Sequence, residues 1–139
     1  MKYGNLTNPT IEILKDIKTV HSFGFDFVEI GMEGPEGDTR IVEKKKDKII
    51  QILKNFDAPA IVHTSWWMSL GSPYETIREA WLGEFRKIIE LSGELGIHHV
   101  NTHSHSAGMF LRSDKYKKLV LAGFVKSLKD SVKHAKQCG

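Results

Sequence analysis

Residues 100–108 read Val-Asn-Thr-His-Ser-His-Ser-Ala-Gly, an apolar beginning followed by alternating polar side chains and a glycine. Because successive side chains of a β-strand point to opposite faces, a strand at this point carries Asn101, His103 and His105 on one face. The residues between them lie on the other face. The stretch therefore predicts a strand that presents imidazole groups on one side where it ends.

Three earlier segments of the chain are organised in the same way. Each begins with apolar or aromatic side chains and then reaches a polar group, which is Asn5 in the first segment, Glu29 in the second and His63 in the third. Carboxylate and imidazole groups bind metal ions or transfer protons, and an amide hydrogen-bonds a ligand. The recurrence predicts a functional site at one edge of a sheet.

The composition is that of one globular domain over residues 1–139. Hydrophobic residues make up 40% and charged residues 27% of the chain, which excludes disordered, collagen-like and disulfide-rich proteins. A chain of 139 residues is too short for two domains of ordinary size. We therefore expect a single domain with one core.

The cysteine content and the net charge indicate the cellular compartment of the protein and the class of its partners. The single cysteine fits a reducing compartment, and no amino-terminal apolar run suggests a signal peptide or a membrane span. We therefore expect a cytoplasmic protein without a membrane partner. The net charge of +3 comes mostly from scattered lysines, which we interpret as solvated helix faces in preference to a nucleic-acid surface.

Apolar residues recur with alternating strand and helix periods along the whole chain. Strands are expected over residues 2–6, 25–32, 60–65 and 97–103, and helices over residues 9–23, 39–56, 73–95 and 113–139. Asn8 and Ser72, each followed by proline, are typical of helix starts, and Gly24 and Gly96 are typical of helix ends. Four strand–helix units in tandem predict an α/β fold with a parallel sheet.

The polarity of the strands distinguishes between two architectures. An open doubly wound sheet has helices on both faces and therefore apolar side chains on both faces of its central strands. Here one strand face carries Glu29, His63 and His103, and only the other face is apolar throughout. This pattern is typical of a barrel wall, and a TIM (β/α)8 barrel needs about 250 residues. The sequence therefore predicts four tandem parallel βα units that form half of a TIM barrel.

Two of the histidines are candidate metal ligands. His63 and His103 end neighbouring strands, and adjacent strands lie about 4.8 Å apart, so two imidazoles at the same level can share one divalent ion. Glu29, one strand away, would supply an oxygen donor. The alternative is that these side chains are hydrogen-bonded interior histidines without a metal.

The remaining candidates lie at the same predicted edge. His105 is a candidate proton shuttle or a polar loop residue. Asn5 is a candidate hydrogen-bonding partner of a hydroxyl-rich ligand, or it organises the turn that follows. Trp66 and Trp67 offer a flat wall that stacks on sugar rings or bases, or they close the barrel top or contact a partner.

Residues 25–30, 62–67 and 101–108 resemble the amino-terminal half of the xylose-isomerase-like barrel superfamily. This superfamily contains sugar and sugar-phosphate isomerases and epimerases and also abasic-site nucleases of the endonuclease IV type. In the nuclease branch, histidines that end the third and fourth strands are zinc ligands, and these positions match His63 and His103. The resemblance therefore implies a divalent metal ion, zinc or manganese, as cofactor.

The chain departs from both branches of the superfamily. Where the nucleases have Pro-Gly after the fourth-strand histidine, this sequence has Ser104 and His105, and where they have DNA-contacting residues it has Trp66 and Trp67. In the isomerase branch the metal ligands come from the fifth strand onward, beyond Gly139. The departures weaken a nuclease assignment and imply that a complete isomerase site needs a second half barrel.

The resemblance and the residues together favour a metal-dependent isomerase or epimerase that acts on a small sugar-like substrate. In this interpretation Glu29 and His105 are catalytic, and Asn5, Trp66 and Trp67 bind the substrate. A homodimer that completes the barrel would supply the missing half. The alternatives are an endonuclease IV-like zinc phosphodiesterase acting on abasic DNA, and a half-barrel assembly module without catalysis.

Overall fold

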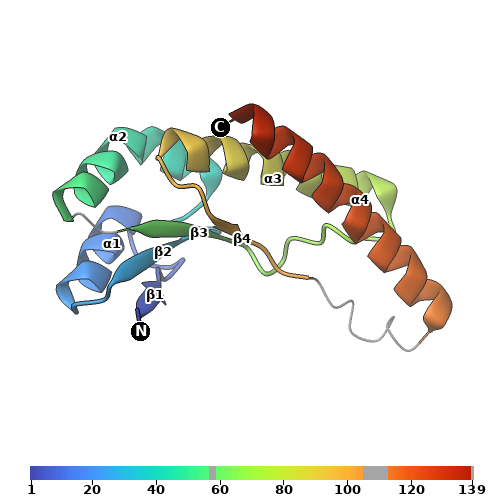
Figure 1. Ribbon diagram of the computed structural model, residues 1–139, viewed down its shortest axis with the longest axis horizontal. Coiled ribbons are helices and arrows are strands. Elements are labelled where there is room, and N and C mark those ends of the chain that lie inside the picture. Colours follow the sequence, from blue (N-terminus) through green and yellow to red (C-terminus); the bar gives the residue numbers. More distant parts are fainter. Residues whose placement is uncertain (57–58, 105–112, 139) are drawn as a thin grey trace.

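The computed structural model describes residues 1–56, 59–104 and 113–138, and strands and helices alternate along these residues (Figure 1). The strands are β1 (Gly4–Leu6), β2 (Phe27–Met32), β3 (Ala60–Thr64) and β4 (Val100–Asn101). The helices are α1 (Ile13–Ser22), α2 (Thr39–Phe56), α3 (Glu75–Glu94) and α4 (Asp114–Cys138). This order confirms the four strand–helix units.

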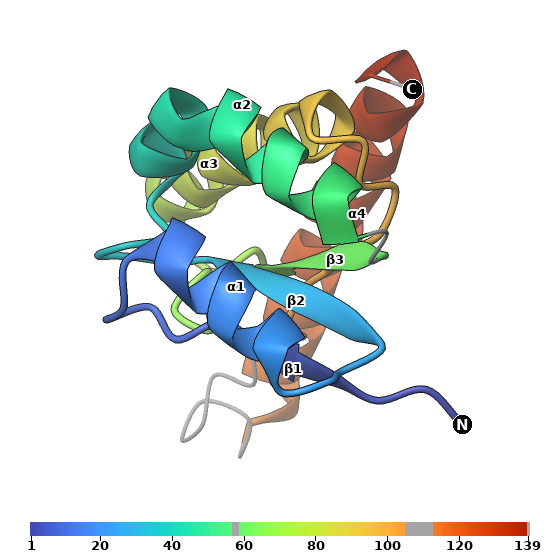
Figure 2. The same ribbon diagram turned by 90° about the vertical axis from the view of Figure 1, so that its left-hand side faces the viewer.

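The 4 strands form one parallel sheet in the order β1-β2-β3-β4. In the register of this sheet, Gly31 lies opposite His63, and His63 lies opposite Asn101. Helices α2 and α3 lie together on one side of the sheet (Figure 2). Neighbouring parallel strands with their connecting helices on one face form a barrel wall, so the fold is half of a TIM barrel.

The two faces of the sheet differ as the alternating pattern predicts. Val28, Ile30 and Val62 are at most 3% exposed and belong to the core between the sheet and the helices. On the opposite face the side chains of Phe27 and Ile61 are only partly buried. The second face is therefore the wall that would line a barrel interior.

The fourth strand is shorter than expected. A strand was predicted over residues 97–103, and β4 consists of Val100–Asn101 alone. Within the described residues β4 pairs only with β3, so no second ladder extends it. The backbone before it is tied elsewhere, because the Ile97 amide donates to the Ser92 carbonyl at the end of α3.

Helices α1 and α3 begin later than the proline signals predict, at Ile13 instead of residue 9 and at Glu75 instead of residue 73. The side chain of Asn8 accepts the amide of Thr10 in a local turn, and α1 begins only at Ile13, where Glu12 caps it. A hydrogen bond from the Lys45 ammonium group is the main cause that holds the pKa of the Glu12 carboxyl below its ordinary value. Asx turns and helix caps use the same side chains, so the sequence does not separate them.

Helix α4 runs alongside α3 and closes one flank of the molecule (Figure 1). Its buried Ser127 hydroxyl donates to the Leu70 carbonyl at 2.8 Å, which anchors the helix to the loop after β3. Gly71 lies directly beneath α4, where a Cβ atom would come within 2.9 Å of the Val120 carbonyl oxygen. Within the described residues, no helix is both long enough and apolar enough to cross a membrane.

The contact at Gly71 makes a matched pair of glycine substitutions informative. Gly71→Ala is expected to destabilise the protein by about 1–3 kcal/mol, because the methyl group overlaps backbone that cannot move without shifting α4. Gly83→Ala, in the middle of α3 with no atom within 4 Å of the added Cβ, is expected to stabilise it by about 0.5–1 kcal/mol. Urea denaturation measures both changes, and equal effects of the two substitutions would contradict this account of α4 docking.

Candidate functional site

The polar side chains of three adjacent strands meet on the open face of the sheet. Glu29 comes from β2, His63 from β3, and Asn101 and His103 from β4 and the residues that follow it. All four have the parity of the open face, because His63 and Asn101 are paired in register and Glu29 and His103 lie two residues from paired positions. The structure therefore brings Glu29, His63 and His103 together, as the alternation predicts.

A continuous chain of hydrogen bonds links these groups. The Nδ1 atom of His63 lies 2.7 Å from Oε1 of Glu29, and its Nε2 atom lies 2.7 Å from Nε2 of His103. The ionised carboxylate can only accept, so Nδ1 of His63 carries the proton. The two Nε2 atoms face each other at hydrogen-bonding distance, so one ring donates a hydrogen bond and the other accepts it.

The surroundings fix the orientation of His63. Its side chain and that of Glu29 are 16% and 19% exposed, so the pair is largely withdrawn from water. The side-chain amide of Asn101 donates to the same Glu29 oxygen at 3.2 Å. The rings of His63 and His103 meet edge to face, with centroids 4.7 Å apart. Glu29 therefore acts on His63 as a fixed anionic acceptor.

This arrangement has the donor chemistry of part of a metal site. Two imidazole nitrogens face one point, and a carboxylate binds the far nitrogen of one ring, as the outer partners of metal-bound histidines do. Within residues 1–56, 59–104 and 113–138, no group of three or more His, Cys, Asp or Glu side chains is placed to hold an ion. His105, the other expected participant, lies outside the described residues. The described donors can supply two nitrogen ligands, and further ligands must come from elsewhere.

Asn5 does not join the cluster. It pairs in register with Val28 and so has the parity of the helix-covered face, while Leu6 pairs with Glu29. Its amide donates to the carbonyl of Leu6 at 3.2 Å. Asn5 is the middle residue of β1 and not its end, and the sequence could not show the register that decides its face.

Trp66 and Trp67 lie just beyond β3 and are 55% and 64% exposed. Their rings are stacked on each other, with centroids 3.9 Å apart. Both line a groove that opens between the loops after β2 and β3, and Glu29, His63 and His103 do not line it. The tryptophans therefore flank a separate hollow at the carboxyl end of the strands.

Asn101 is a member of the cluster that was not among the predicted site residues. Its position on the imidazole face followed from the alternation along residues 100–108. The missing information was its distance from Glu29, which depends on the β2–β3–β4 register. An amide two residues before a predicted histidine ligand is the signal that could have identified it.

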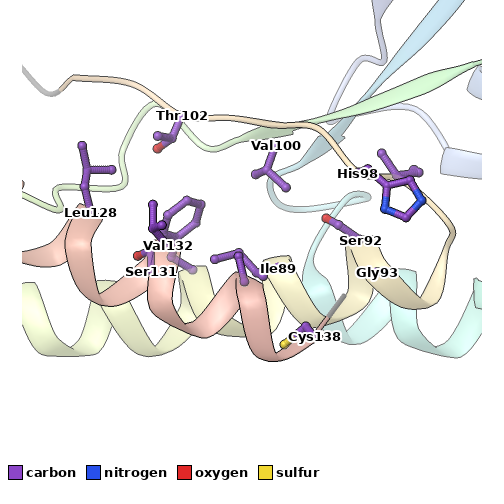
Figure 3. Close-up of a pocket in the computed structure, with 13 residues that line it drawn as sticks. Ile89, Ser92, Gly93, His98, Val100, Thr102, Leu128, Ser131, Val132 and Cys138 are labelled. Atoms are coloured by element: carbon purple, nitrogen blue, oxygen red, sulfur yellow. The ribbon is translucent and has the colours of Figure 1, made fainter.

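A further cavity, of about 320 Å³, lies on the helix side of β4, between that strand, α3 and α4 (Figure 3). Val100 and Thr102 of the β4 segment face Leu128 and Val132 of α4 across it. Its lining is mostly apolar and includes no carboxylate. The cavity shows that α4 stands away from β4, and it offers no acid–base pair.

Comparisons with known proteins are consistent with this geometry. The chain is 31% identical over 97 residues to a protein named "Probable endonuclease 4" from Aquifex aeolicus, covering 68% of this chain and 34% of that protein. A crystal structure of a D-tagatose 3-epimerase-like protein superposes with a TM-score of 0.79 at 19% identity, covering 100% of this chain and 50% of that one. For endonuclease IV from Thermus thermophilus the TM-score is 0.65 at 17% identity, covering 94% and 47%.

The chain thus spans about a third of the length of the curated relative and about half of the two solved structures. The structural similarities, at identities below 20%, show the shared fold. Residues 17–139 match the family described as xylose isomerase-like TIM barrel, which is most of the chain. This protein therefore belongs to the xylose isomerase-like TIM barrel family.

Proposed function

We propose that this chain is half of a metal-dependent sugar or sugar-phosphate isomerase or epimerase that works in the cytoplasm. The observation that carries the proposal is the meeting of the His63 and His103 Nε2 atoms, 2.7 Å apart, with Glu29 on the far nitrogen of His63. The two Nε2 atoms would hold zinc or manganese. When bound, the metal would polarise a substrate carbonyl and its neighbouring hydroxyl.

The residues of the chain would have distinct tasks in such a reaction. Glu29 would keep the Nδ1 proton of His63 in place, so that Nε2 points into the open face as a donor atom. Asn101 would hold the Glu29 carboxylate in position through its amide. Glu29 and His105 remain the proposed groups that move a proton between adjacent carbons of the substrate. Asn5, Trp66 and Trp67, none of which belongs to the cluster, remain proposed substrate contacts.

A second half barrel would complete the site. We propose that two copies of the chain associate about a two-fold axis along the barrel axis, which would place two histidine pairs around one cavity. Exposed apolar side chains near both edges of the four-stranded sheet support this association. Tyr3, on the segment leading into β1, is 62% exposed, and α4 exposes Leu121 and Val132 at 62% and 55%.

The proposal is tested by metal content and proton exchange on the purified chain. After equilibration with zinc or manganese and removal of free metal, about one ion per histidine pair is expected by elemental analysis. Ketohexoses, D-tagatose among them, are then incubated with the protein in D₂O. Proton NMR is expected to show loss of the signal of the hydrogen next to the carbonyl. A protein that retains metal but exchanges no hydrogen in any sugar would contradict the isomerase assignment.

The curated relative favours a second candidate function. The similarity to "Probable endonuclease 4" supports an endonuclease IV-like zinc phosphodiesterase, in which His63 and His103 would hold zinc. This candidate predicts salt-sensitive binding to a duplex with an abasic site, and nicking of that duplex. Nicking without sugar exchange would replace the first proposal with this one. A metal-free monomer without either activity would leave the non-catalytic half-barrel module.

A further inference from the structure

All three tryptophans of the sequence line one groove. The groove has a volume of about 1000 Å³ and lies between the loop after β2, the loop after β3, the first turn of α2 and the middle of α3. Trp66 and Trp67 come from the loop after β3, and Trp81 comes from α3. The loop after β3 and helix α3 thus bring every indole ring of the protein to one groove.

The groove has an apolar floor and an open aromatic wall. Met32, Met68 and Ile88 line it and are at most 3% exposed, so the floor belongs to the packed core. Trp66 and Trp67 are more than half exposed, although they are among the largest apolar side chains. A stacked, exposed indole pair beside a cavity is the surface that ring-shaped ligands cover.

Paired charges line the rim of the groove. Asp38 accepts two hydrogen bonds from the Arg40 guanidinium, which hold the pKa of that carboxyl below its ordinary value. Glu84 accepts the Thr39 hydroxyl at 2.6 Å and lies 3.6 Å from the Lys87 ammonium group. These groups keep unused hydrogen-bonding positions that can donate to and accept from hydroxyl groups.

The balance of positive and negative side chains around the groove excludes a strongly anionic ligand. The cations that line the groove, Arg40 and Lys87, are matched by Asp38 and Glu84, and Glu33 adds a further carboxylate. A phosphate backbone gains its affinity from an excess of cations, which this groove does not offer. A neutral, hydroxyl-rich ring suits both the indole wall and the mixed rim.

We propose that this groove binds a saccharide ring separate from the one that reacts, so that a glycoside or disaccharide is a better substrate than a free monosaccharide. This inference rests on the proposed function and narrows its substrate class. Ser65 lines the groove and follows His63 by two residues, so the groove opens at the same end of β3 as the histidine cluster. A groove of about 1000 Å³ lies at the upper end of the range for small-molecule sites.

The test is isothermal titration of the metal-free chain with cellobiose and with glucose. Cellobiose is expected to bind measurably more tightly than glucose, and Trp67→Ala is expected to weaken cellobiose binding by about tenfold. Tyr74→Ala is the matched control, because Tyr74 is a similarly exposed aromatic residue, 66% against 64%, on the same loop but outside the groove. The control is expected to bind cellobiose as the unsubstituted chain does.

Several outcomes would overturn the inference. No binding of either sugar would overturn it, as would an equal loss in Tyr74→Ala and Trp67→Ala. Tighter binding of oligothymidylate than of cellobiose would make the groove a base-stacking site instead. Circular dichroism checks that the variants fold, and Trp67→Phe, which keeps a stacking ring, is expected to retain intermediate affinity. Because the titration uses no metal and no turnover, its result is independent of whether the histidine cluster is catalytic.

Discussion

His63→Ala is expected to weaken zinc binding by more than about a hundredfold, since it removes one of two nitrogen donors and the group that Glu29 orients. The His63 Nε2 atom lies 2.7 Å from the His103 Nε2 atom, and within the described residues no group of three or more His, Cys, Asp or Glu side chains is placed to hold an ion. A single remaining imidazole binds a divalent ion no better than a surface histidine. Competition with a chromophoric chelator measures the change in the dissociation constant.

Glu29→Gln separates the role of the carboxylate from that of the ligands. The substituted amide would keep a hydrogen-bond acceptor near His63 Nδ1 but lose the negative charge that the carboxylate places beside the ring. Zinc affinity is therefore expected to fall by about 10–100-fold, less than for His63→Ala. His99→Ala is the control, because His99 is exposed and belongs to no part of the cluster, and its affinity is expected to stay unchanged. Equal losses in all three variants would show that zinc binds elsewhere.

The sequence could predict the cluster because it depends on few physical rules. Strand parity alone places Glu29, His63 and His103 on the face away from the helices, and sequential pairing of parallel strands places them side by side. The same parity put Val28, Ile30 and Val62 in the core, where each is nearly inaccessible. These inferences need only the strand period and the order of the elements.

Other features depend on strand register and on the packing of distant elements, which short stretches of sequence do not reveal. The face of Asn5 depends on the β1–β2 register, which pairs it with Val28. The groove at Trp66 and Trp67 depends on how a loop, α2 and α3 meet in space, so the tryptophans were expected near the sugar but not with Trp81. Interpretations of His105 remain predictions, since it lies outside the described residues.

The exposed side of α4 is the surface at which we expect two copies of the chain to associate. Val125 and Val132 of α4 are 40% and 55% exposed and lie seven residues apart, so they share one side of the helix. Val132 also lines the cavity between α4 and β4 (Figure 3). In a barrel of eight units this side of the helix packs against the next strand–helix unit. In a dimer of half barrels, the first unit of the second copy would take that place.

The double substitution Val125→Glu with Val132→Glu is therefore expected to convert a dimer into a monomer. Two buried, unpaired carboxylates at an interface are strongly unfavourable, whereas the same side chains on an exposed helix are tolerated. Analytical ultracentrifugation over a range of protein concentrations measures the change, with urea denaturation as a check that the monomer is folded. Leu119→Glu is the control, because Leu119 is 50% exposed on the same helix but points to a different side.

The pattern of results distinguishes a half barrel that is completed by its own copy from one that is completed by another chain. If the unsubstituted protein dimerises and only the valine variant dissociates, this side of α4 is the surface between copies. A protein that is monomeric at every concentration contradicts the homodimer. The lysines at 126, 129 and 133 lie along the same helix, so a dimer that forms only at high salt would show that their mutual repulsion opposes the contact.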